Sequence, residues 1–201
     1  MIKEMLRKGR IPMLLRPAEI SDAAQMCRIY HPYVMETAIT FIYHEPTEET
    51  FLDKLRTIKP QYPFIVCEQD CEVVGYAYAS AMRPHEAYQW GVELSVYVDR
   101  DFHGRGIGRK LYNGLFNLLK LQGYQCAYGV ISLPNEKSLA LHAAFGFETL
   151  GVFPKAGYKL GKWHDIIWLV KNLGDFPENP VQPTPFSKLS NEVVQTALEN
   201  C

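Results

Sequence analysis

The sequence predicts an α/β (α+β) fold in which helices flank one mixed, mostly antiparallel sheet. Two apolar, β-rich segments, 64–68 and 73–81, are separated by only four residues, which is the arrangement of a β-hairpin. Later in the chain, strand patterns alternate with amphipathic helices, which favours parallel pairing across a crossover helix. At 201 residues and 47% hydrophobic content, the chain is long enough to bury one core.

The first part of the chain contains a strand and two helices ahead of the hairpin. Residues 13–16 form the first predicted strand. Ser21 or Asp22 then caps a helix that runs to about Tyr30, because these side chains accept hydrogen bonds from first-turn N–H groups. Thr47 caps a second helix, and two glutamates follow it in the first turn, where the helix dipole favours anions.

The middle of the chain contains the clearest strand–loop–helix unit. A long apolar strand, 88–98, leads through a glycine-rich loop into a helix at 108–122, whose apolar residues recur at helical spacing. Gly123 stands where a left-handed C-terminal cap belongs. The next predicted strand is 124–131.

One more helix and two strands complete the predicted domain. Pro134 and Asn135 introduce a helix that runs to Phe145, and strands follow at 147–153 and 163–170.

From Asn172 the composition changes, because four prolines crowd a short stretch that cannot hold a helix or a central strand. The pattern of residues 190–198 is typical of one or two short amphipathic turns. We therefore divide the chain into an N-terminal extension (1–12), a domain (13–171) and a proline-rich tail (172–201). The tail either packs on the body or on a partner subunit, or is partly disordered.

Composition excludes several classes of function. The formal net charge of -1 provides no broad basic field for nucleic acid or an anionic membrane. No stretch approaches the roughly 20 apolar residues of a membrane span, and residues 1–10 lack the apolar core of a secretory signal. Five cysteines without a Cys-x-x-Cys pair argue against a disulfide framework or a metal site, and for the cytoplasm.

The glycine-rich loop is the most informative motif. Gly104, Gly106 and Gly108 follow a strand and open directly into a helix. Glycines let backbone N–H groups turn inward at little cost, and a helix N-terminus adds free N–H groups and partial positive charge, so the loop suits a diphosphate. A tight turn without a ligand remains the alternative. The dinucleotide fingerprint and the Walker pattern both fail to match.

The order of motifs resembles the GNAT superfamily of acetyl-CoA-dependent N-acetyltransferases. It comprises the strand, the x-Gly-x-Gly-x-Gly loop, an amphipathic helix, a strand, and a helix from Asn135 that ends in Phe-Gly-Phe at 145–147. The resemblance implies a GNAT-type sheet with a cleft between the glycine-loop strand and the next parallel strand. It also implies acetyl-CoA as co-substrate. His103 stands where the family usually has Arg or Gln.

Motifs across the chain are also similar to the phosphinothricin acetyltransferase family. They include Arg16-Pro-Ala, Ala38-Ile-Thr-Phe, Arg83-Pro and Val92-Glu-Leu-Ser-Val-Tyr-Val, and the match runs from Leu14 to about Val170. This resemblance implies acetylation of the α-amine of phosphinothricin, methionine sulfoximine or methionine sulfone, and a homodimer. The alternatives are another amine (a polyamine, an aminoglycoside or a protein N-terminus) and a non-catalytic acyl-CoA-binding module.

Two side chains are candidates for proton transfer. Glu93 alternates with apolar residues in its strand, so it shares a face with Ser95 and Tyr97, and the resemblance implies that it is the general base. His142 lies where related acetyltransferases often carry a tyrosine that protonates the coenzyme A sulfur, and imidazole titrates near neutral pH. A structural role for either residue stays open, as do Tyr112 and Tyr128 as alternative acids.

The resemblance assigns the remaining site residues. Those expected to bind acetyl-CoA are Val96, Tyr97, Val98, His103, Gly104, Arg105, Gly106, Ile107, Gly108, Arg109 and Asn135. Those expected to contact the amino-acid substrate are Thr40, Phe41, Arg83, His85, Glu93 and Ser95. An arginine suits a carboxylate or phosphinate because it donates two parallel hydrogen bonds.

Overall fold

The computed structural model describes residues 13–201, so the predicted N-terminal extension lies outside the described residues. The strands are β1 (Leu14–Pro17), β2 (Phe64–Gln69), β3 (Glu72–Ala81), β4 (Gly91–Val98), β5 (Cys126–Ser132), β6 (Glu148–Lys159) and β7 (Lys162–Asn172). The helices are α2 (Ala23–Glu36), α3 (Glu48–Ile58), α4 (Ile107–Gln122), α5 (Glu136–Ala144) and α6 (Asn191–Glu199).

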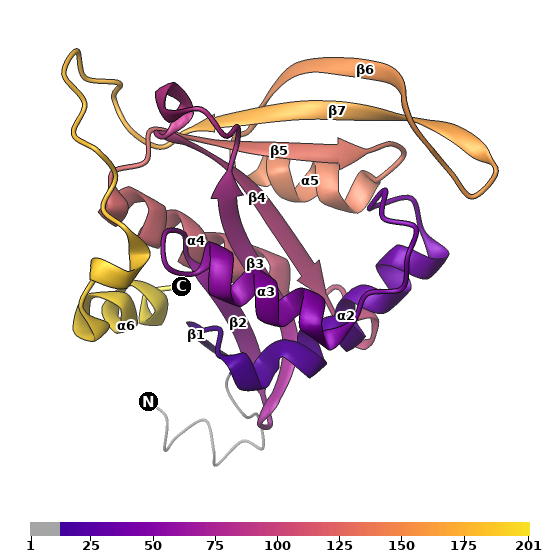
Figure 1. Ribbon diagram of the computed structural model, residues 1–201, viewed down its shortest axis with the longest axis horizontal. Helices are drawn as coiled ribbons and strands as arrows, with labels where there is room; N and C mark the ends of the chain where they lie inside the picture. The colour runs from indigo at the N-terminus through magenta and orange to yellow at the C-terminus, as the bar shows by residue number, and fades with distance from the viewer. Residues whose placement is uncertain (1–12) are drawn as a thin grey trace.

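The strands form one sheet in the order β1-β2-β3-β4-β5-β7-β6. Every neighbouring pair is antiparallel except β4 and β5, which are parallel and joined through α4. Figure 1 shows α2 and α3 in front of the β1–β4 part, with α4 behind it. The predicted mixed, mostly antiparallel sheet flanked by helices is therefore confirmed.

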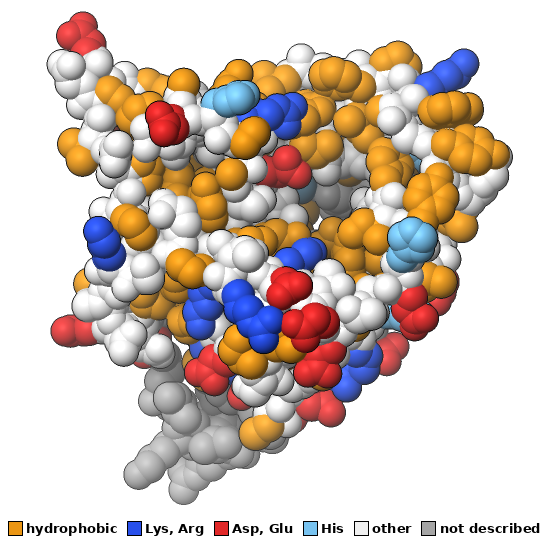
Figure 2. All heavy atoms as spheres, in the orientation of Figure 1, with side chains coloured by type: hydrophobic (Ala, Val, Ile, Leu, Met, Phe, Trp, Pro, Cys, Tyr) orange, Lys and Arg blue, Asp and Glu red, His pale blue; other side chains and the backbone are white. Residues whose placement is uncertain are grey.

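The sheet opens between its two parallel strands. β4 pairs with β3 over the whole of Val92–Val98, but with β5 only at Gly91, Val92 and Glu93. Beyond Glu93 the two strands separate, and the β5-facing edge of β4 has no strand partner. In Figure 2 the surface is hollowed here, between the β5–β7 part above and α2 and α3 below.

Strand alternation distributes the core over both faces of the sheet. Leu94, Val96 and Val98 belong to the cluster that α4 covers, whereas Tyr97 packs against Tyr76 in the cluster under α2 and α3. The predicted division of β4 into two faces is therefore correct for these residues.

Three predicted boundaries were wrong. The first helix runs to Glu36 rather than Tyr30, because Pro32 within it costs one backbone hydrogen bond without ending it. β4 starts at Gly91, since the preceding residues Glu86–Tyr88 form a 3₁₀ turn. β6 continues past an irregularity after Phe153 and pairs with β7 again as far as Lys159.

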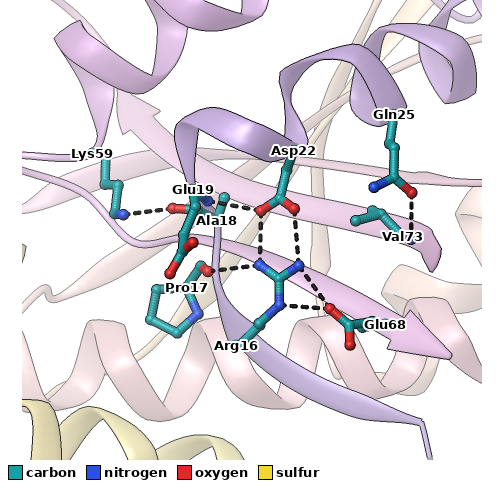
Figure 3. Close-up of polar contacts among 9 residues, drawn as sticks. All are labelled: Arg16, Pro17, Ala18, Glu19, Asp22, Gln25, Lys59, Glu68 and Val73. Atoms are coloured by element: carbon teal, nitrogen blue, oxygen red, sulfur yellow. Dashed lines mark hydrogen bonds and ion pairs between the residues drawn. The ribbon is translucent and has the colours of Figure 1, made fainter. Parts of the chain in front are cut away.

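Asp22 does not cap α2 with its side chain, because its carboxylate has other partners. It accepts hydrogen bonds of 2.7 and 2.8 Å from the guanidinium of Arg16, and one of 2.8 Å from the N–H of Glu19 (Figure 3). Arg16 also donates to Glu68 at 2.8 Å. This ion cluster fastens β1 to β2 and to the start of α2, so we assign it a structural role.

The C-terminal segment packs on the body of the protein. Ser190 caps α6, and Val194, Ala197 and Leu198 are buried against α4 and β1. The Asn117 side chain on α4 donates to the Ala197 carbonyl at 3.0 Å. Within residues 13–201, no helix has both the length and the apolar character that a membrane span requires.

Candidate active site

The opening between β4 and β5 leads into a cavity of about 120 Å³. It is lined by Ile39, Glu93, Leu94, Ser95, Val96, Tyr97, Tyr112, Val130, Ile131, Asn135, Ser138 and His142. The structure therefore brings together both predicted proton-transfer residues, Glu93 and His142, with Asn135 and the middle of β4.

Glu93 enters the cavity at the last residue pair that β4 shares with β5, opposite Tyr128. Its side chain is half-buried. Burial raises the pKa of the Glu93 carboxyl, and the nearby Arg83 cation opposes that rise. A carboxylate with a raised pKa is a better proton acceptor near neutral pH.

His142 and Tyr112, which both line the cavity, form a hydrogen-bonded pair. The imidazole Nε2 lies 3.0 Å from the Tyr112 hydroxyl, and Nδ1 lies 2.8 Å from the Ser138 carbonyl oxygen. A carbonyl only accepts, so Nδ1 carries the proton, and Nε2 of the neutral ring accepts from Tyr112. Burial lowers the pKa of His142 and raises that of Tyr112, which keeps both groups neutral.

Gly129 on β5 makes room for the imidazole. A Cβ atom at this position would lie 2.6 Å from Nε2 of His142, so any larger residue would displace the ring. Tyr128, the other alternative acid, does not line the cavity. Its hydroxyl is 3.5 Å from the sulfur of Cys126, and its ring meets Trp168 edge-on.

The glycine loop has the geometry that a diphosphate seat requires. Gly104 and Gly106 have φ values of 76° and 81°, and a Cβ at either would meet nothing within 4 Å, so the loop is open to a ligand. Gly106 is the N-cap of α4 and has no side chain to accept from the first-turn N–H groups. These groups remain available for an anion.

His103 and the loop arginines have protein partners. Nε2 of His103 lies 3.0 Å from the Tyr33 hydroxyl and 3.1 Å from the Val98 carbonyl. The guanidinium of Arg105 lies over Phe102, and that of Arg109 over Phe145. His103 therefore joins the loop to α2.

Of the predicted substrate residues, Glu93 and Ser95 line the cavity, whereas Thr40, Phe41, Arg83 and His85 do not. Arg83 lies over Trp168, with its guanidinium carbon 5.2 Å from the ring centroid. The Thr40 hydroxyl is 2.8 Å from that of Tyr30, and neither Thr40 nor Phe41 lines the cavity. His85 is exposed, at the N-cap of the 3₁₀ turn before β4.

Sequence reasoning missed several lining residues. Ile39 lies beside Thr40 in a segment that carried the family resemblance, and Ser138 is one helical turn before His142, so both were adjacent to recognised positions. Val130 and Ile131 show only the apolar pattern of a strand. Among the described residues, no group of three or more His, Cys, Asp or Glu side chains is placed to hold a metal ion.

The sheet opens between its parallel strands, a glycine loop suited to a diphosphate follows β4, and one cavity is lined by a carboxylate and a Tyr–His pair. Together these features define an acyl-CoA-dependent transferase. The chain belongs to the GNAT acetyltransferase family, because the model of the acetyltransferase (GNAT) domain matches residues 15–168. It is therefore an acetyl-CoA-dependent N-acetyltransferase, as the motifs predicted.

Individual members of the family to which this chain is similar include enzymes that acetylate small molecules. The chain is 35% identical to the phosphinothricin N-acetyltransferase of Streptomyces viridochromogenes over 175 residues, which cover 87% of this chain and 96% of the relative. It is 32% identical to the L-methionine sulfoximine/L-methionine sulfone acetyltransferase of Pseudomonas aeruginosa, in an alignment that covers 79% of this chain and 94% of the relative. The chain is also similar to the crystal structure of a phosphinothricin acetyltransferase from Sinorhizobium meliloti in complex with acetyl-CoA, with a TM-score of 0.82 and 32% sequence identity. The superposition covers 88% of this chain and 97% of the other.

Proposed function

We propose that this enzyme acetylates the α-amine of a small amino acid such as phosphinothricin, methionine sulfoximine or methionine sulfone. The observation that supports it most directly is the cavity, where Glu93 meets the Tyr112–His142 pair. The names of the similar proteins supply the substrate class. The Arg83 guanidinium lies over the Trp168 ring and is close enough to lower the pKa of Glu93, so it provides a cation for a carboxylate or phosphinate.

Glu93 removes the proton from the substrate ammonium, because only the free amine has a lone pair that can attack the thioester carbon. Its desolvated carboxylate is suited to this step, directly or through one water. The carbonyl oxygen is polarised by backbone N–H groups of Val96 or its neighbours, on the edge of β4 that lacks a strand partner.

We assign protonation of the departing thiolate to the Tyr112 hydroxyl rather than to His142. The neutral imidazole holds its only N–H on the Ser138 carbonyl, so it has no proton to deliver at Nε2. Tyr112 keeps its proton over the whole working pH range, because burial raises its pKa. In the resting site this O–H donates to Nε2 of His142, so it must turn from the imidazole toward the sulfur when the thiolate departs.

The diphosphate of acetyl-CoA binds at residues 104–109, so that the thioester extends along β4 past Asn135. We expect Gly106→Ala to weaken acetyl-CoA binding roughly tenfold, because an alanine favours other shapes of the free loop by about 1–2 kcal/mol, and binding must restore the left-handed one. Isothermal titration calorimetry measures the dissociation constant for acetyl-CoA in the wild type and the variant. Gly151→Ala is the matched control, since a Cβ there also meets nothing within 4 Å and no left-handed backbone is involved. Equal affinities in the two variants would contradict the placement.

Arg83 is expected to affect the pH profile as well as substrate binding. The Arg83 cation lowers the pKa of Glu93, so Arg83→Met raises it further. Since the base works only when ionised, the acidic limb of kcat/KM moves to higher pH. The measurement is kcat/KM against pH, with the exposed Arg28→Met as control. If the acidic limb of the kcat/KM profile does not shift in Arg83→Met, Arg83 does not influence the pKa of the catalytic base.

A turnover screen tests the proposed substrate class. Acetyl-CoA is supplied with methionine sulfone, methionine sulfoximine, phosphinothricin, spermidine, an aminoglycoside and an alanine-terminated peptide, and release of free thiol is followed. We expect the three amino acids to have the highest kcat/KM. Preference for the peptide or the polyamine would overturn the proposal, and binding without turnover would favour an acyl-CoA-binding module.

We also propose that two copies associate through the β6–β7 hairpin. Leu150, Val152, Phe153, Tyr158, Leu160 and Trp163 are each about half exposed there. Figure 2 shows hydrophobic side chains gathered over this part, at the upper right. Apolar patches of this kind mark interaction sites. Sedimentation velocity should give the mass of a dimer, and a monomer at micromolar concentration would refute the proposal.

A further inference from the structure

We propose that Lys159 is a positioning residue that holds the α2–α3 loop (residues 37–47) as a wall of the amino-acid side of the cleft. The inference rests on the proposed function for its substrate. Lys159 is the last residue of β6 and only 4% exposed. Its ammonium donates to the carbonyl oxygens of Val34 and Thr40, both at 2.7 Å. Figure 1 shows this loop beside the far end of the hairpin.

Burying a lysine ammonium without a carboxylate partner costs free energy, so other groups must stabilise it. Within residues 13–201, no carboxylate lies within ion-pair distance of the Lys159 ammonium. Its cost of desolvation is offset only by the two carbonyls and by the negative end of the α2 dipole, since Val34 is in the last turn of α2. Burial accordingly lowers the pKa of Lys159.

The two carbonyls stand on either side of the point where the chain leaves α2. Val34 belongs to the helix and Thr40 to the loop. One ammonium that binds both sets the direction in which the loop departs. The imidazole Nε2 of His164 donates to the backbone carbonyl of Lys159 at 3.0 Å, which fixes the lysine's own position in the hairpin.

The loop meets the hairpin at two more points. The Phe41 ring lies over Gly157, where a Cβ would come within 2.6 Å of its Cδ2 and Cζ atoms. The Tyr43 hydroxyl donates to the Tyr158 carbonyl. These contacts reinforce the link that the Lys159 ammonium makes between the loop and the hairpin.

The loop reaches the reaction site through Ile39, which lines the cavity with Glu93. A loop released by loss of the Lys159 ammonium would withdraw this wall from the acceptor. The glycine loop would keep its own tie to α2, the Tyr33 hydroxyl, which donates to the Val98 carbonyl at 2.6 Å. We therefore expect the defect to be specific to the amino acid.

The test is Lys159→Met, which keeps the stem of the side chain and removes the ammonium. Lys162→Met, at an exposed lysine of the same hairpin, is the control. We expect kcat/KM for methionine sulfone to fall about 10- to 100-fold through a raised KM. KM for acetyl-CoA should not change, and hydrogen–deuterium exchange should become faster in residues 37–47 alone. A merely structural role would raise exchange across the fold and affect both substrates.

The proposal is overturned if Lys159→Met folds and both hydrogen–deuterium exchange of the loop and KM for the amino acid are the same as in the wild type. If the wild-type enzyme acetylates no amino acid, the proposed function fails, while the exchange measurement still decides whether Lys159 holds the loop. If Lys159→Met does not fold, Gly157→Ala replaces it, because its methyl group displaces Phe41 from the hairpin. Faster loop exchange with a normal amino-acid KM in that variant would reject the loop as a substrate wall, and normal exchange would show that the hairpin does not hold the loop.

Discussion

Replacing Glu93 by glutamine is expected to lower kcat for the amino acid by about 10²–10⁴-fold, the usual contribution of a general base. The amide preserves the shape of the carboxylate but accepts no proton from the ammonium. Since the acetyl-CoA seat lies on the glycine loop, its affinity should stay the same. Steady-state kinetics and calorimetry with acetyl-CoA together measure the two effects.

Glu72→Gln provides the matched control, because Glu72 is exposed at the start of the adjacent strand β3. It should have the kinetics of the wild type. Retention of most activity in Glu93→Gln would mean that another group removes the proton. Loss of acetyl-CoA binding in the same variant would instead indicate that the cavity had collapsed.

Shortening Leu198 to alanine should destabilise the whole protein by about 2–5 kcal/mol, although this residue lies in the C-terminal segment. Leu198 is 2% exposed. One of its methyl groups approaches Gly114 of α4 so closely that a Cβ there would lie 3.0 Å away, and Leu15 and Ile65 close the same space. The cavity left by the deletion cannot be filled by rigid neighbours on α4, β1 and β2.

Denaturant unfolding at equilibrium checks this expectation. Val193→Ala is the control, since Val193 is on the same helix but 40% exposed, and should cost within about 0.5 kcal/mol. Similar unfolding free energies for the two variants would show that α6 is not docked on the body in solution.

Local patterns along the chain predicted most of the elements. Thr47 and Asn135 cap the helices that follow them, as their positions before amphipathic segments indicated. Gly123 adopts the left-handed C-terminal cap, with φ 91°. These features depend on residues within a turn or two of each other, and that range is what spacing and capping report.

Boundaries were less predictable where a contact between two elements decides them. Asp22 has the residue type of a cap, but its carboxylate binds Arg16 instead, because β1 lies beside the start of α2. β6 continues beyond Phe153 because β7 pairs with it again from Gly157. Each of these contacts joins two different elements, β1 to the start of α2 and β6 to β7, so the periodicity within one element does not report it.

By itself, the sequence determined the strand that presents Glu93, the glycine loop at the start of α4, and the family to which both belong. It could do so because alternation fixes the face of a residue and glycine spacing fixes a backbone shape. Only the tertiary structure decided that Tyr112 meets His142, that Ile39 closes the cavity, and that Lys159 is buried against Thr40. Those contacts join residues that local patterns treat as independent, and only the way the sheet opens and the hairpin folds back brings them within hydrogen-bond reach.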